Sequence, residues 1–201
     1  MLTVGPDLTP HEWGGRACLA LVNSIVWRRS EAPIEVLTDY GRLAELIGEA
    51  GWLADTAGLE RAAAADPVAA ERALARAVAL RETLFRLFSA VAAGEPADEV
   101  DRQSLNDAMA EALPHVRLDR ELKGIWDDPT ALDLPRWQAA ASAGRLLTAE
   151  DLSRVKQCPG ERCGWVFVDD SRNRSRRWCE PNQCGNRERV RAYYHRRTKT
   201  A

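Results

Sequence analysis

Four cysteines near the end of the chain constrain its fold more than any other feature. They are spaced as Cys158-x4-Cys163 and Cys179-x4-Cys184, with 15 residues between the two pairs. A tetrahedral Zn²⁺ takes four thiolates, and a short loop can present two of them from one turn. A redox pair more often has the closer spacing Cys-x2-Cys. We therefore predict that these cysteines bind one structural zinc ion, which keeps no open position for catalysis.

The segments around the cysteines predict the fold of a small C-terminal module. The interval contains two short runs typical of strands, Trp165–Val168 and Arg176–Trp178, joined by a polar turn. A helix is expected after Asn186. Loop, hairpin, loop and helix are together the plan of a treble-clef-like zinc finger, which we place at residues 151–201.

Charge is divided unevenly between this module and the rest of the chain. The protein carries 28 Lys and Arg against 30 Asp and Glu, a net charge of −2. Residues 151–201 hold 13 basic and 6 acidic side chains, a net charge of +7, which leaves −9 on residues 1–150. Such asymmetry is typical of an acidic globular domain that carries a basic interaction module.

Arginines dominate the basic module. They occur on the expected hairpin turn with its second strand and at the start of the last helix. Two or three of them could offset the −2 charge of a zinc tetrathiolate, but the module has more than that offset requires. A cationic turn beside a helix start is suited to binding phosphates. The candidate nucleic-acid-binding residues are Arg172, Arg174, Arg176, Arg177, Arg187, Arg189 and Arg191.

Three kinds of partner are compatible with this pattern. The first is duplex DNA, which would make the protein a zinc-finger transcription regulator. The second is an acidic protein, because treble clefs also serve as docking surfaces. The third is RNA, which the same arginines would also bind.

The rest of the chain predicts a mainly α-helical domain at residues 1–150, followed by the finger. The longest helix is expected from Asp66-Pro67 to Ala93, with apolar residues on two faces, and should be the central element. A short β-hairpin is expected within this domain, and Ala62–Ala65 is interpreted as a loop. The other expected helices are Gly14–Arg28, Asp39–Ala50 after Thr38, Asp101–Leu113, Trp137–Leu147 and Ala149–Lys156, and the hairpin strands are Val116–Leu118 and Gly124–Trp126.

Polar residues in the expected helical core suggest two alternatives. Asn23 could be a buried amide bonded to backbone, and Arg81 could pair with an acid such as Glu45. Alternatively, a small anionic or polar effector could bind in a pocket formed by Asn23, Trp27, Arg28 and Arg81. The helical domain would then sense a ligand, or it could serve in homo-oligomer formation.

Several classes of protein are disfavoured by the sequence. No run approaches the 18 apolar residues of a membrane span, and Met1–Pro10 does not resemble a secretory signal. A cytoplasmic location is therefore expected, where clustered thiols bind metal rather than form disulfides. Cys18 lies in an apolar stretch and is expected to be a small buried side chain. No nucleophile–base pattern or phosphate-binding glycine loop occurs, so we do not expect an enzyme.

Two segments also resemble known families. The run Cys-Glu-Pro-Asn-Gln-Cys-Gly-Asn-Arg at 179–187 resembles the signature of the CGNR zinc fingers, although Glu180-Pro181 stands where Ser-Met is more common. The segment Ala17–Ser24 resembles the opening motif of the ABATE domain, with Ala20 in place of the usual Asp. ABATE domains are found ahead of such fingers and are described as stress-induced transcription regulators. The resemblance implies metal binding and a role in a transcriptional stress response.

Overall fold

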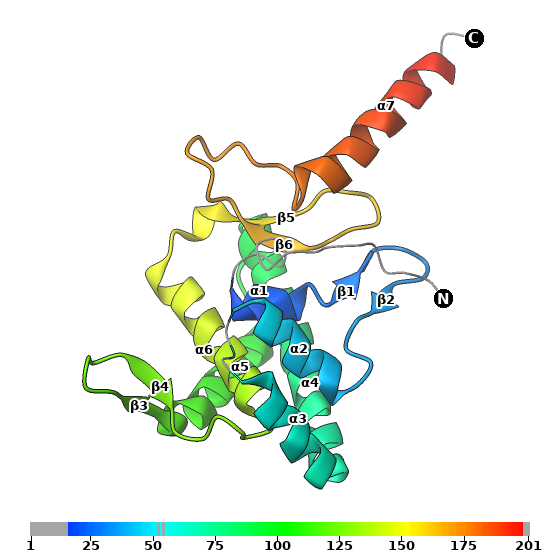
Figure 1. Ribbon diagram of the computed structural model, residues 1–201. Helices are drawn as coiled ribbons and strands as arrows, with labels where there is room; N and C mark the ends of the chain where they lie inside the picture. The colour runs from blue at the N-terminus through cyan, green and yellow to red at the C-terminus, as the bar shows by residue number, and fades with distance from the viewer. Residues whose placement is uncertain (1–15, 52, 54, 199–201) are drawn as a thin grey trace.

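The computed structural model describes residues 16–51, 53 and 55–198, and most of these residues are helical (Figure 1). The segment Met1–Pro10 and the expected helix start at Gly14 lie outside that range. Within it, no helix is both long and apolar enough to cross a bilayer. The α-helices are α1 (Ala17–Val22), α2 (Tyr40–Glu49), α3 (Thr56–Ala65), α4 (Pro67–Ala93), α5 (Glu99–Ala112), α6 (Leu134–Ala149) and α7 (Asn186–Thr198).

The strands form three small antiparallel pairs rather than one sheet. They are β1 (Ile25–Val26) with β2 (Ile34–Glu35), β3 (Val116–Leu118) with β4 (Gly124–Trp126), and β5 (Val155–Gln157) with β6 (Val166–Val168). Short turns of other helix types precede β3, β5 and α7: η1 (Leu113–His115), η2 (Leu152–Arg154) and η3 (Pro181–Gly185). The prediction of a mainly α protein with a small hairpin and a finger is confirmed.

Helix α4 is the central element, as its sequence predicts. The Asp66 side chain caps it by accepting a hydrogen bond from the Ala69 backbone N–H at 2.9 Å, and Pro67 occupies the first turn. Gly94 ends it in the left-handed region with φ of 71°, where a side chain would be strained. The helix packs against α1, α2, α3, α5, α6 and β5.

Some expected boundaries are wrong for local reasons. Helix α1 ends at Val22 instead of Arg28, since Asn23 and Ser24 turn the chain into β1. The expected loop Ala62–Ala65 is the end of α3, in keeping with the high helix propensity of alanine. Asp39, rather than Thr38, caps α2 by accepting from the Arg42 N–H.

The expected hairpin of the finger is also wrong. Strand β6 pairs with β5, which precedes the first cysteine, and Lys156 lies opposite Phe167. The segment 176–178 forms no strand, and the expected helix Ala149–Lys156 is replaced by η2 and β5. The first cysteine pair therefore lies in the loop of the hairpin, which leaves 169–178 free to form a separate loop.

Asn23 joins the helical part of the protein to this hairpin. Its side chain is buried, and its amide makes two hydrogen bonds with the Val166 backbone. Nδ2 donates to the carbonyl oxygen at 2.9 Å, and Oδ1 accepts from the N–H at 3.0 Å. On either side of β5, the Cys158 N–H donates to the Trp165 carbonyl and the Asp169 N–H donates to the Arg154 carbonyl. The backbone groups of Val166 therefore point to the opposite edge of β6. The interpretation of Asn23 as a buried amide bonded to backbone is confirmed.

Replacing Asn23 by alanine leaves two buried backbone groups of Val166 without a partner. Because each such group costs about 1–3 kcal/mol, we expect the free energy of unfolding to fall by about 2–4 kcal/mol. Urea unfolding of the zinc-loaded protein, followed by circular dichroism, measures this change. Asn173→Ala, at an exposed loop position, is the matched control. A loss no larger than in the control would contradict the proposed joining role.

Candidate metal centre and basic surface

The four cysteines of the two pairs come together in one buried cluster. Their Sγ atoms all lie within 4.8 Å of one another, and none is in a disulfide. The Sγ of Cys179 lies 3.5 Å from that of Cys163 and 3.6 Å from that of Cys184. Sulfurs about 2.3 Å from a tetrahedral Zn²⁺ are about 3.8 Å apart, so the cluster has the size and donor set of a four-thiolate zinc site.

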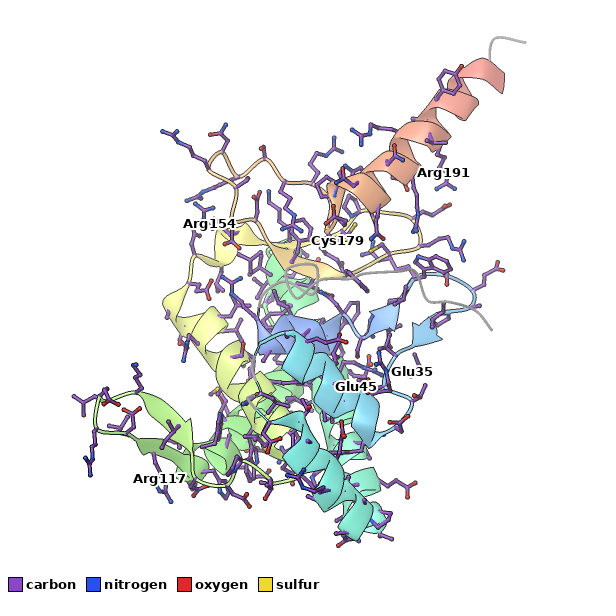
Figure 2. All side chains as sticks on the ribbon, in the orientation of Figure 1. Glu35, Glu45, Arg117, Arg154, Cys179 and Arg191 are labelled. Atoms are coloured by element: carbon purple, nitrogen blue, oxygen red, sulfur yellow. The ribbon has the colours of Figure 1, made fainter. Side chains whose placement is uncertain are left out.

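Each pair is positioned by a different element. Cys158 and Cys163 flank the loop between β5 and β6, and Gly164 follows with φ of 76°, which turns the chain into β6. Cys184 lies within η3, which continues directly into α7. Figure 2 shows Cys179 at the base of α7, close to β5 and β6. The cluster therefore connects the hairpin to the last helix.

The thiols cannot all ionise without a cation. Hydrogen bonds from Cys163, Cys179 and Cys184 lower the pKa of Cys158 far below its ordinary value. The hydrogen bond with Cys158 is the largest cause that raises the pKa of Cys179, and burial adds to it. The pKa of Cys184 is also lowered and that of Cys163 is raised, so two of the thiols ionise readily and the other two resist ionisation. A divalent cation removes this repulsion, and the four cysteines bind one Zn²⁺ as a structural ion.

The loop 169–178 is anchored by an ion pair whose carboxylate is buried. Lys156 Nζ donates to Asp169 Oδ2 at 2.5 Å, and the Asp169 side chain is fully buried. The same ammonium donates to the backbone carbonyls of Arg174 at 2.7 Å and Arg176 at 3.0 Å. Asp169 also accepts from the Arg176 backbone N–H at 3.0 Å. These bonds hold the arginine-rich loop against the hairpin.

The surroundings of Asp169 also change its acidity. Burial would raise the pKa of this carboxyl, but hydrogen bonds from Lys156 and Ser171 outweigh burial and lower the pKa to about 2 from 3.8. Because the pKa is depressed in the folded state, the carboxylate contributes stability that is complete above pH about 4. That contribution is lost as the pH falls through about 2.

The structure divides the seven predicted arginines by what they contact. Arg172, Arg177 and Arg189 are exposed and make no ion pair or hydrogen bond with any described residue. The guanidinium of Arg177 lies 5.8 Å from the ring of Trp178. Trp178, Arg177 and Arg189 line a hollow of about 410 Å³ between the loop and α7. We call Arg172, Arg177 and Arg189 the free arginines.

The remaining predicted arginines are engaged within the protein. Arg176 donates to the carbonyls of Trp178 and Cys179, and its guanidinium lies 4.8 Å from the Phe167 ring. The others pair with nearby side chains. Arg174 Nη2 lies 2.8 Å from Asp151 Oδ2, and Arg191, labelled in Figure 2, pairs with Glu161 and Glu188.

Arg187 lies beside the zinc site. Its guanidinium is 5.5 Å from the ring of Trp27, and that of Arg162 is 4.5 Å from the same ring. Both arginines line a cavity of about 470 Å³ that also includes Cys163 and Cys184. Both guanidinium groups therefore lie on the same cavity as the thiolate centre, where the sequence allows two or three arginines to offset its charge.

The side chains that were considered for an effector pocket are engaged by protein groups. Asn23 is bonded to Val166, and Arg81, which is buried, pairs with Glu35 at 2.7 Å and Glu82 at 2.8 Å. The partner is Glu35 and not Glu45, which pairs with Arg42; Figure 2 labels both acids.

The other two members of that set are also engaged. Arg28 pairs with Glu82 at 2.7 Å, and its guanidinium lies 4.0 Å from the Phe85 ring. The ring of Trp27 lies against the guanidinium groups of Arg162 and Arg187. We therefore do not propose a ligand pocket at these residues.

The sequence pattern does not identify three residues that hold this region together. It predicts a helix over Lys156, Asp169 is one of two adjacent acids in the expected turn, and Arg162 has no distinguishing position. The acid pair directly after an apolar strand was the available signal for Asp169. Its lysine partner could not be identified, because that choice depends on which segment pairs with β6.

Comparison with known families covers most of the chain. A family model described as "CGNR zinc finger" matches residues 154–197. A second model, ABATE, described as "Putative stress-induced transcription regulator", matches residues 15–150. A search of curated proteins finds no match.

Zinc content provides a direct test of the metal centre. The purified protein should contain one zinc per chain, and Cys163→Ser or Cys184→Ser should lower this to near zero because a tetrahedral site loses a ligand. Elemental analysis measures the content. Cys18→Ser is the matched control, since Cys18 is buried outside the cluster and is hydrogen-bonded with Ser142. Full zinc content in Cys163→Ser would refute the four-ligand site.

A second prediction concerns the anchored loop. Asp169→Asn removes the charge that holds Lys156, so the loop should open more often at neutral pH. Trypsin should then cleave after the loop arginines about ten-fold faster, as followed by mass spectrometry. Asp170→Asn, at the neighbouring exposed carboxylate, should leave the cleavage rate near that of the parent. Equal rates in both variants would contradict the anchoring role.

Proposed function

Since the chain belongs to the ABATE family and ends in a CGNR zinc finger, we propose that it is a transcription regulator whose finger binds duplex DNA. The family descriptions support a role in transcription regulation for the protein, but they do not assign that role to particular residues. Binding of duplex DNA is the more specific proposal, and it rests on the surface of the finger.

The proposal of DNA binding rests on the free arginines. Cations that serve only the fold are normally paired, as Arg174, Arg176 and Arg191 are here. Arg177 and Arg189 instead face the hollow between the loop and α7, and no described carboxylate forms an ion pair with them, because Glu188, which also lines the hollow, pairs with Arg191. Unpaired guanidinium groups on two adjoining elements are suited to phosphates, which they can bind through two hydrogen bonds at once.

The structure also narrows the set of DNA-binding candidates. Arg176 is committed to backbone carbonyls, and Arg187 faces the thiolate centre beside Trp27. We therefore assign phosphate contacts to Arg172, Arg177 and Arg189. Arg174 and Arg191 can contribute only after their ion pairs with acidic side chains break. The zinc ion and the Lys156–Asp169 pair contribute by fixing the loop relative to α7.

Fluorescence anisotropy with a labelled duplex over a range of salt concentrations tests the proposal. Three phosphate contacts predict that log K falls with log salt with a slope of about −3. Arg172→Ala, Arg177→Ala and Arg189→Ala should each weaken binding to all sequences similarly and flatten the slope by about one. Arg72→Ala, at an exposed position of α4 far from the finger in sequence, is the matched control.

The other two partner classes give different outcomes of the same experiment. Stronger binding to single-stranded RNA than to duplex DNA, with the same arginine dependence, would favour an RNA-binding factor. Absence of salt-dependent binding to either nucleic acid would reject the proposal and favour docking to an acidic protein. All variants should retain one zinc per chain, because none alters a ligand.

A further inference from the structure

A second cavity lies in the helical part of the protein, away from the finger. Its volume is about 500 Å³, and it lies between α6, the β3–β4 hairpin and the connection from α2 to α3. The hairpin projects from the helical part at the end opposite α7 (Figure 1). Small-molecule sites are typically about 300–1,000 Å³, so this cavity has a suitable size.

The walls of the cavity are mainly apolar. Leu53 comes from the α2–α3 connection, Val116 and Trp126 from the two strands, and Leu134 from the first turn of α6. Ile125 is 46% exposed at the same site. An apolar body inserted here would remove surface of these side chains from water, which is the main source of affinity in such sites.

Two polar groups on α6 are not satisfied by the protein. Gln138 is 7% exposed, yet its Oε1 is buried and accepts no hydrogen bond from any residue that the structure describes. Arg145 is exposed, and no carboxylate among the described residues pairs with it. The one acid in the described lining, Asp55, already caps α3 at Gly58 and lies 3.9 Å from Arg61. An unpartnered amide and an unpartnered cation therefore remain for a ligand.

The spacing of these groups constrains what can bind. Gln138 and Arg145 are seven residues apart on α6, which places them on one face about 10 Å apart along the axis. The small side chains of Ala141 and Ser142 lie between Gln138 and Arg145, so the helix surface is recessed there. A ligand that satisfies both groups must be polar at its two ends and apolar between them.

We propose that this cavity binds a small amphipathic organic acid. Its carboxylate pairs with Arg145, its apolar body packs against Trp126 and Leu53, and a hydroxyl at its far end forms a hydrogen bond with the Gln138 amide. The site is independent of the free arginines and of DNA binding. It also differs from the set around Arg81, since it uses none of those residues.

Isothermal titration calorimetry on the zinc-loaded full chain tests the proposal with 6-hydroxy-2-naphthoate, which has a carboxylate and a hydroxyl at opposite ends of an apolar ring pair. We expect one saturable site per chain. Arg145→Gln should weaken binding about ten-fold while leaving the affinity for 2-naphthol, which lacks the carboxylate, unchanged. Arg72→Gln, at an exposed position of α4, is the matched charge control and should bind like the parent.

The amide is tested separately. Gln138→Leu should lower the affinity for 6-hydroxy-2-naphthoate to that for 2-naphthoate and leave the affinity for 2-naphthoate unchanged. If this variant does not fold, as judged by zinc content and thermal unfolding, Arg145→Gln alone decides. The proposal is overturned if the parent shows no saturable binding, or if Arg145→Gln binds the hydroxy acid as tightly as the parent. Neither result bears on the DNA-binding proposal.

Discussion

The thiolate cluster is the interaction on which the C-terminal part of the chain depends. A segment of about 45 residues buries too little apolar surface to fold by itself, so metal binding supplies much of its stability. The ion connects three segments: the β5–β6 loop, the end of the arginine-rich loop and the start of α7. Without it, the thiols repel one another on ionisation, and α7 is held to the β5–β6 loop by exposed contacts such as the Arg191–Glu161 ion pair.

The finger is nevertheless not an independent module. Strand β5 packs on the central helix α4, and β6 receives the Asn23 amide along its outer edge. Trp27, from the helical part, contacts two arginines beside the zinc site. The helical part therefore helps position the proposed DNA-binding surface, and a change in it could reach the finger through these contacts.

The arginines of the finger fall into two groups, those that contact other groups of the protein and the free arginines. Arg176 and Arg187 lie close to backbone carbonyls and thiolates, where their charge compensates negative groups of the fold. Arg172, Arg177 and Arg189 have no such compensation from the residues that the structure describes, and the proposal assigns their charge to phosphates. The net charge of +7 predicted from the sequence is therefore larger than the charge that an external partner encounters.

The sequence by itself determined the zinc ligands, the central helix and the family resemblance, because each depends on local spacing or periodicity. Asp66-Pro67 and Gly94 fix the ends of α4 through local backbone geometry, and the paired cysteine loops fix the metal. The tertiary structure alone decided which segment pairs with β6. Both Val155–Gln157 and 176–178 are three-residue segments that could form the partner strand, and the sequence does not distinguish them. It also decided which arginines are free and that Asn23 bonds Val166, because those contacts join residues far apart in the chain.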